Sequence, residues 1–192
     1  MKQTIKSIAF IAIAAFMTIS FSGILDGKME INTEKSTITW KGYKVTGSHT
    51  GHLAIKSGSL TFKNDKLSGG EFIIDMTSLT STDLEGEYKG KLEGHLKSDD
   101  FFGVEKFPTA TLIFKKVTST GKNSYSVSGD LTIKGKTNNI VFDLSVYGRK
   151  ANASLKIDRS KYDVKYGSSS FFEGLKDKVI YDEFDLITDL EF

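Results

Sequence analysis

The chain contains no cysteine, a single proline and only two arginines, Arg149 and Arg159. Without a thiol it has no disulfide bond, no thiolate nucleophile and no cysteine for lipoprotein acylation. Scarce arginine removes the forked donors that favour phosphate contacts. Residues 1–22 hold two lysines and no acid, so the remaining chain has 24 basic and 24 acidic residues and no net charge. Nucleic acid is therefore not an expected partner.

Long apolar runs are also absent after the N-terminus. Lys2 and Lys6 precede the uncharged, mostly apolar stretch 8–21, a pattern typical of a secretory signal peptide. At about 14 residues the stretch is too short to span a bilayer comfortably, so we expect no stable membrane anchor. We expect residues 1–22 to be cleaved and residues 23–192 to form a single domain in the periplasm or otherwise outside the cell.

Apolar and polar residues alternate with a period of two through most of residues 23–192. This pattern is typical of antiparallel strands with one buried face, and it is clearest over residues 125–134. Roughly eight such strands, short turns and no second composition block predict an all-β fold, a closed antiparallel β-barrel. A barrel of this size is either filled by its own side chains or holds one small ligand, and alternation alone does not distinguish the two.

Glycine and asparagine mark the predicted irregularities of these strands. The alternation changes phase at Gly42, which predicts a β-bulge, and across Gly58, which predicts a sharp bend within one long strand. Turns are predicted at the polar clusters between strands: residues 64–65, 121–123, 138–139 and Gly148.

One segment has a helical period instead, which predicts an inserted helix near residues 83–97. Thr82 and Glu85 fit a capping box at its start. The helix carries two series with a spacing of four residues, one apolar (Leu84, Tyr88, Leu92, Leu96) and one of glycine (Gly86, Gly90, Gly94). Glycine inside a helix is unfavourable, so the helix either lies very close to a neighbour or is partly irregular.

The stretch HLKSDDFFGVEKFPTATLIF, residues 95–114, joins this helix to a strand. Phe101 and Phe102 place two large rings where the helix breaks, and such rings must be buried. Pro108 lacks a backbone donor, so a strand is predicted to begin at it or just after it. His95 and Asp99 could orient a polar head group or cap the helix end.

Catalytic motifs are not found in the sequence. It has no Gly-x-Ser-x-Gly elbow and no phosphate loop, and adjacent carboxylates on extended chain point to opposite faces. The histidines His49, His52 and His95 leave a metal-dependent enzyme open if their imidazoles converge on one ion. A solvated turn explains His49 and His52 more simply, so we expect neither a metal nor another cofactor, and no enzyme.

Three segments, His95–Phe102, Phe107–Thr111 and Gly129–Ile133 followed by Gly135 and Thr137, resemble the YceI family when taken together with the early Trp40 strand. The resemblance covers about residues 30–192. It implies an exported bacterial protein with a lipocalin-like barrel that binds a polyisoprenoid or related lipid inside. It also implies apolar ligand contacts in the matching segments, with these candidates: Trp40, Phe72, Ile74, Leu96, Phe101, Phe102, Leu112, Phe114, Leu131, Ile133, Phe142 and Leu144.

The sequence leaves three hypotheses of function. The leading one is a periplasmic carrier that encloses a polyisoprenoid or similar long acyl lipid, with the helix and the Phe101–Phe102 pair closing one end. Because burying each methylene contributes about 0.8 kcal/mol, an apolar interior suffices for binding without a catalytic motif. The alternatives are a filled, ligand-free barrel acting as an envelope stress or interaction module, and the metal-dependent enzyme.

Overall fold

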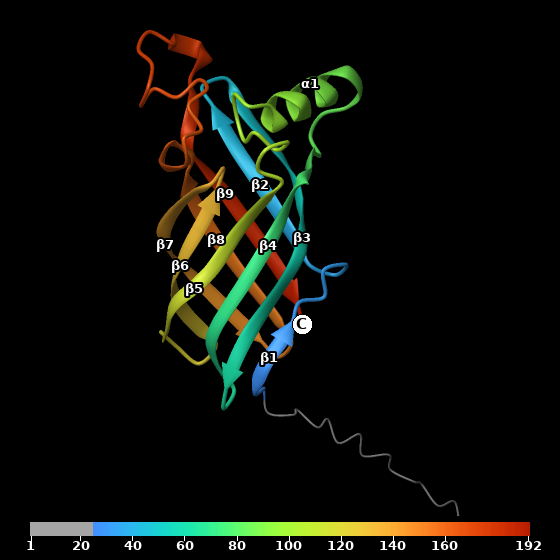
Figure 1. Ribbon diagram of the computed structural model, residues 1–192, viewed down its shortest axis with the longest axis vertical. Coiled ribbons are helices and arrows are strands. Elements are labelled where there is room, and N and C mark those ends of the chain that lie inside the picture. Colours follow the sequence, from blue (N-terminus) through green and yellow to red (C-terminus); the bar gives the residue numbers. More distant parts are fainter. Residues whose placement is uncertain (1–24) are drawn as a thin grey trace, which may run out of the picture.

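The computed structural model describes residues 25–192, so the predicted signal peptide lies outside the described residues (Figure 1). The described part contains strands, one α-helix and two short 3-10 helices. In chain order they are β1 (Gly27–Glu30), β2 (Thr37–Lys44), β3 (Gly47–Lys63), β4 (Lys66–Ser81), α1 (Gly86–Lys97), β5 (Thr109–Ser119), β6 (Ser124–Ile133), β7 (Lys136–Tyr147), β8 (Lys150–Asp158), η1 (Arg159–Tyr162), η2 (Lys176–Lys178) and β9 (Ile180–Glu191).

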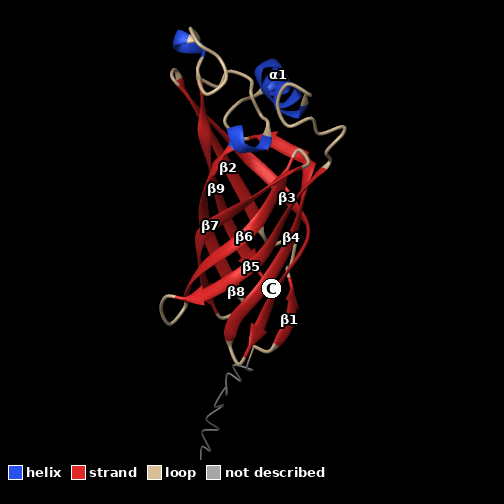
Figure 2. Cartoon of the chain, turned by 60° about the vertical axis from the view of Figure 1, so that its left-hand side comes forward, coloured by secondary structure: helices blue, strands red, loops and turns tan. Residues whose placement is uncertain are grey.

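Strands β2 to β9 form a closed up-and-down barrel (Figures 1 and 2). Each pairs antiparallel with the strand that follows it in sequence, and β9 pairs with β2 to close the ring. β1 is an additional short strand that pairs with the second half of β3. The closed eight-stranded antiparallel barrel with one helix confirms the predicted fold. We call the end that carries α1 and the β8–β9 connection the helix end, and the opposite one, with β1 and the C-terminus, the far end (Figure 1).

The alternating residues of the sequence form the inner and outer faces of the barrel wall. Along β6 every second residue is buried, from Tyr125 to Ile133, and the residues between are only partly exposed. β8 alternates in the same way between exposed and buried positions. Because successive strand residues point to opposite faces, this places one apolar set of side chains inside the barrel.

The predicted irregularities in β2 and β3 are present. The β2–β9 register shifts between Gly42 and Lys44, which confirms a bulge there. β3 continues through Gly58 as one strand of 17 residues, as the predicted bend requires. At Gly51 a Cβ atom would lie 1.8 Å from the Thr80 carbonyl oxygen and 2.6 Å from the Trp40 indole ring. Glycine therefore allows β3 to pass directly beneath that ring.

Most predicted turns are correct, and one is wrong. Asn64 and Asp65 both have positive φ and form the two-residue hairpin between β3 and β4, the geometry of a type I′ turn. The turns at residues 121–123 and Gly148 also lie between strands. The turn predicted at 138–139 lies inside β7.

The β6–β7 turn is formed instead by Lys134 and Gly135, both with positive φ. The two asparagines that suggested a turn are strand residues, and their side-chain amides donate hydrogen bonds to backbone carbonyls of adjacent segments. Asn139 donates to the Gly129 carbonyl at 3.1 Å and Asn138 to the Lys161 carbonyl at 2.9 Å. Asparagine here satisfies backbone acceptors of adjacent segments and does not reverse the chain.

The helix α1 differs from its predicted form at its start. Its N-cap is Glu85 without a side-chain hydrogen bond, so the capping box at Thr82 is wrong. The helix is attached through its middle, where the Glu93 carboxylate accepts hydrogen bonds from Thr80 Oγ1 at 2.7 Å and from the Ser81 backbone N–H at 2.8 Å. Within residues 25–192, no helix combines the length and apolar character needed to cross a bilayer.

The apolar series on α1 is only partly covered. Tyr88 is 74% exposed, whereas Leu92 and Leu96 face the barrel interior. Neither explanation considered above for the glycine series holds at Gly90 or Gly94. A Cβ at either position would meet nothing within 4 Å, so close packing does not require glycine there, and both lie inside one continuous α-helix. Gly86, the first residue of the helix, has a positive φ of 55°.

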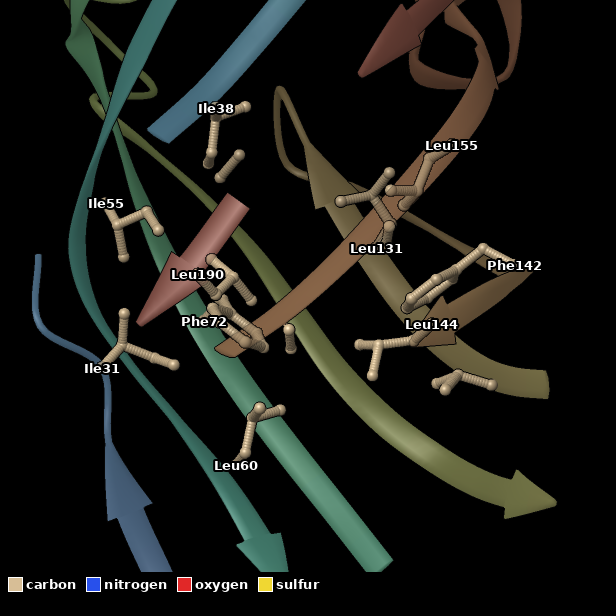
Figure 3. Close-up of a cluster of buried hydrophobic side chains, with 14 of the residues drawn as sticks. Ile31, Ile38, Ile55, Leu60, Phe72, Leu131, Phe142, Leu144, Leu155 and Leu190 are labelled. Atoms are coloured by element: carbon tan, nitrogen blue, oxygen red, sulfur yellow. The ribbon is translucent and has the colours of Figure 1, made fainter. Parts of the chain in front are cut away.

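Buried apolar side chains pack against one another toward the far end. Leu60 and Val127 are completely buried, and the Phe62 and Phe192 rings stack with centroids 5.4 Å apart. Figure 3 shows part of this continuous cluster, with side chains from several strands extending into the barrel. The far end is therefore filled by the protein's own side chains.

Candidate functional site

Two adjoining cavities lie inside the barrel. The outer cavity, at the helix end, has a volume of about 310 Å³, and the inner cavity, in the middle of the barrel, has about 80 Å³. They are separated by side chains that line both of them: Ile38, Ile74, Leu131 and Leu186. Small-molecule sites commonly measure roughly 300–1,000 Å³, so the outer cavity is large enough for a ligand. The interior is thus not completely filled.

The twelve apolar residues singled out from the sequence all border this space. The outer cavity is lined by Trp40, Ile74, Leu96, Phe101, Phe102, Leu131 and Ile133. The inner cavity is lined by Phe72, Ile74, Leu112, Phe114, Leu131, Phe142 and Leu144. Figure 3 shows Phe72, Leu131, Phe142 and Leu144 in the buried cluster. Their contact with a ligand stays a prediction.

Sequence reasoning missed other lining residues. The apolar ones include Leu53, Met76, Leu92 and Phe184, most of which belong to the same alternating faces and could have been included on that signal. The polar ones are Tyr43, Lys44, Arg159, Tyr166 and Tyr181. Nothing in their local sequence marks them, because the β8–β9 connection brings several of them to the helix end.

Phe101 and Phe102 lie beneath the end of α1, as the sequence predicts. Phe101 is 5% exposed, and its ring centroid is 5.0 Å from that of Phe102, which in turn lies 6.4 Å from Phe184. The Gly103 N–H donates to the Ser98 carbonyl at 2.8 Å, and positive φ at Gly103 turns the chain back. This tight turn holds both rings against the outer cavity.

Arg159 is a buried cation on the wall of the outer cavity, only 2% exposed. Its Nη1 donates to the Val164 carbonyl at 2.9 Å, its Nη2 to Ile180 at 2.9 Å and its Nε to Tyr181 at 3.2 Å. Asp182 Oδ1 lies 3.4 Å from Nη2. Burial lowers the pKa of Arg159, but an arginine remains charged under all ordinary conditions. The guanidinium therefore both fixes the β8–β9 connection and brings positive charge to the cavity.

Tyr43 and Lys44 extend this polar rim from the end of β2. Tyr43 donates to Asp185 Oδ2 at 2.6 Å, and this hydrogen bond is the main cause that lowers the pKa of Asp185. Lys44 forms no ion pair with any residue in the range 25–192. No carboxylate of the described residues therefore neutralises the Lys44 ammonium.

His95 lines the outer cavity from α1. Its ring is edge-on to Tyr166, with centroids 4.3 Å apart, and to Phe101, at 5.8 Å. In the described part of the chain its imidazole makes no hydrogen bond. Asp99 lies elsewhere: its side chain is 63% exposed, pairs with Lys106 and lines neither cavity. Of the two predicted polar contacts, only His95 borders the candidate site.

The three histidines do not converge. His49 and His52 are strand residues of β3 and not part of a solvated turn. His49 Nδ1 lies 2.9 Å from Asp83 Oδ2 and borders the outer cavity, whereas His52 Nδ1 bonds to Thr39 on the outside of the wall. Residues 25–192 contain no group of three or more His, Cys, Asp or Glu side chains that could hold a metal ion. The three-histidine metal site is therefore wrong.

An up-and-down barrel with an apolar cavity is the architecture of small barrels that enclose one ligand. The chain belongs to the YceI family, because the YceI-like domain model matches residues 29–192. A UPF0312 protein of Staphylococcus epidermidis is 31% identical over 137 residues, which cover 62% of this chain and 75% of that protein.

Solved structures agree with this fold. Burkholderia cenocepacia BcnA superposes with a TM-score of 0.66 at 21% identity, covering 83% of this chain and 98% of that one. A polyisoprenoid binding domain from Saccharophagus degradans, implicated in plant cell wall breakdown, gives a TM-score of 0.61 at 15% identity over 88% and 97% of the two chains. At these identities the likeness establishes the barrel alone.

Proposed function

We propose that this protein is an exported carrier that binds one long apolar chain, a polyisoprenoid or similar lipid, inside the barrel. The observation that supports it is the pair of adjoining cavities whose walls are mostly aliphatic and aromatic. Over most of this surface a ligand gains affinity from methylene and methyl groups removed from water. The Saccharophagus degradans domain, described as polyisoprenoid binding, has the same fold.

Binding inside the barrel is tested by filling the outer cavity. Ala110 lines that cavity, and Ala54 lies exposed on the outer face of the wall. Phenylalanine at position 110 should exclude two or three methylenes of a bound chain and weaken binding by about 2 kcal/mol, about 30-fold. Delipidated protein is titrated with fluorescent cis-parinaric acid, which is then displaced by geranylgeraniol.

The matched control is Ala54→Phe, which adds the same ring outside and should leave both affinities unchanged. If unmodified protein retains neither probe, the carrier is refuted and an interaction module is favoured. If Ala110→Phe binds as well as Ala54→Phe while both remain folded, the ligand does not lie in the outer cavity.

Export rests on Lys2, Lys6 and the apolar stretch 8–21. Cell fractionation followed by intact mass measurement of the purified protein tests it. A periplasmic or secreted species that lacks about 22 N-terminal residues is expected, and a full-length cytoplasmic species would contradict export.

A further inference from the structure

Apart from tyrosines, all the titratable side chains that line the outer cavity are basic. Lys44, His49, His95 and Arg159 contribute to its wall, and no aspartate or glutamate does. The nearby carboxylates do not line the cavity. Asp83 bonds to His49, Asp182 lies beside Arg159, and Asp185 accepts a hydrogen bond from Tyr43. The cavity thus presents basic groups at its helix end and aliphatic groups farther in.

Arg159 is the most deeply buried of these basic groups. Bonds to three carbonyl oxygens account for three of its five N–H donors. The Phe101 ring centroid is 5.2 Å from its guanidinium carbon, so one face of the cation is covered by an aromatic ring. A buried charge is costly without a partner of opposite sign, and the partner here is Asp182, whose Oδ1 lies 3.4 Å from Nη2 without forming a hydrogen bond. Two of the five donors, one on each Nη, therefore make no hydrogen bond among the described residues.

Unlike Arg159, two further groups on the wall lack polar partners among residues 25–192. Lys44 has no ion pair, and the His95 imidazole has only aromatic neighbours, Phe101 and Tyr166. Both come from elements other than that of Arg159, one from the end of β2 and the other from α1. Donors from three separate elements therefore border the same end of the same cavity.

From this geometry we infer that the carrier selects amphiphiles with an acidic head group, a carboxylate or a phosphate, bound by Arg159, Lys44 and His95 at the helix end. The inference rests on the proposed function and specifies the chemical class of its ligand. The chain of such a ligand lies toward the inner cavity, and its head group lies at the outer rim. Hydrogen bonds between charged groups are stronger than those between neutral groups, which makes the head group a basis for selection.

Matched ligand pairs test this inference. At neutral pH the delipidated protein is titrated with palmitic acid against hexadecanol, and with farnesyl phosphate against farnesol. Within at least one pair, the acid should bind about tenfold or more tightly than the alcohol. A preference only in the first pair identifies a carboxylate, and a preference only in the second identifies a phosphate.

The double variant Lys44→Met, His95→Gln avoids the structural bonds of Arg159. It should reduce the preference to within about threefold while alcohol affinity is retained, since the lost interactions are hydrogen bonds to the acidic head group. Lys150→Met, which removes an exposed lysine at the far end of the barrel, should leave the preference unchanged. Circular dichroism spectra and melting curves check that each variant folds.

The outcomes separate the two proposals. Equal affinity for acid and alcohol in the unmodified protein overturns the head-group inference and leaves the carrier intact. A preference that survives in the double variant also overturns this assignment of residues. Failure to bind any of the four ligands refutes the carrier itself.

Discussion

Replacing Gly90 and Gly94 by alanine should stabilise α1 and slow its opening. Both positions are helical, and an added Cβ would meet no atom within 4 Å, so the substitution introduces no clash. Alanine is favoured over glycine in a helix interior by about 0.8–1.0 kcal/mol per residue, which gives about 2 kcal/mol for the pair. The opening equilibrium of the helix should fall about 30-fold.

Hydrogen–deuterium exchange followed by mass spectrometry measures this directly. Peptides covering residues 87–97 should exchange about 30-fold more slowly in the double variant, and peptides from β6 should be unaffected. Gly86→Ala is the matched control in the same helix. Gly86 has a φ of +55°, where alanine costs about 1–2 kcal/mol, so this variant should exchange faster.

Exchange at the original rate or faster in a folded double variant would contradict this role of the two glycines. Slower exchange in Gly86→Ala would contradict it equally. Because Leu92 and Leu96 line the outer cavity, the stabilised helix should also slow dissociation of a bound chain, which stopped-flow displacement of the fluorescent probe measures.

Other properties of the barrel can be tested in the same way. Leu60→Ala should lower the free energy of unfolding by about 2–5 kcal/mol in urea titrations because Leu60 is completely buried, whereas Val141→Ala at an exposed position should change it by less than about 0.5 kcal/mol. Glu93→Ala removes the acceptor for Thr80 and Ser81, so amides of α1 should exchange faster while those of the barrel do not; equal acceleration in both would contradict a local attachment. The hydrogen bond from Tyr43 lowers the pKa of Asp185, so its stabilisation is complete above the ordinary carboxyl pKa of about 3.9 and is lost as the pH falls through the lowered value. Urea titrations below pH 5 should accordingly show a smaller loss of stability for Asp185→Asn than for the unmodified protein, and identical pH profiles would argue against this contribution.

The barrel itself could be predicted because the alternation that specifies each strand lies within a short segment of the sequence. Tyr125 and Ile133 belong to a period of two that only a half-buried strand explains, and the same period recurs around the ring. Turns were harder to predict from the sequence, because asparagine occurs in two different structural roles. At position 64 it adopts positive φ, whereas Asn139 uses its amide to bond a neighbouring carbonyl, and Lys134 with Gly135 makes the turn.

The candidate site was predictable only in its apolar part. Phe72 and Leu131 follow from the inward-facing pattern, but that pattern is the same for a filled barrel and for one with cavities. Arg159 could not be identified as a site residue, because its position on the wall depends on carbonyl oxygens of residue 164, just after η1, and of residues 180 and 181, at the start of β9. Contacts formed by a returning segment leave no periodic signal in the sequence.

The stacked Phe62 and Phe192 rings at the far end restrict how a ligand can move through the barrel. The wall is an unbroken ladder of strands and one end is packed, so a chain bound inside must leave along the path by which it came. If the proposed carrier function is correct, the tail of a bound chain enters first and leaves last. An acceptor of that chain would then meet its head before any of the tail is exposed to water.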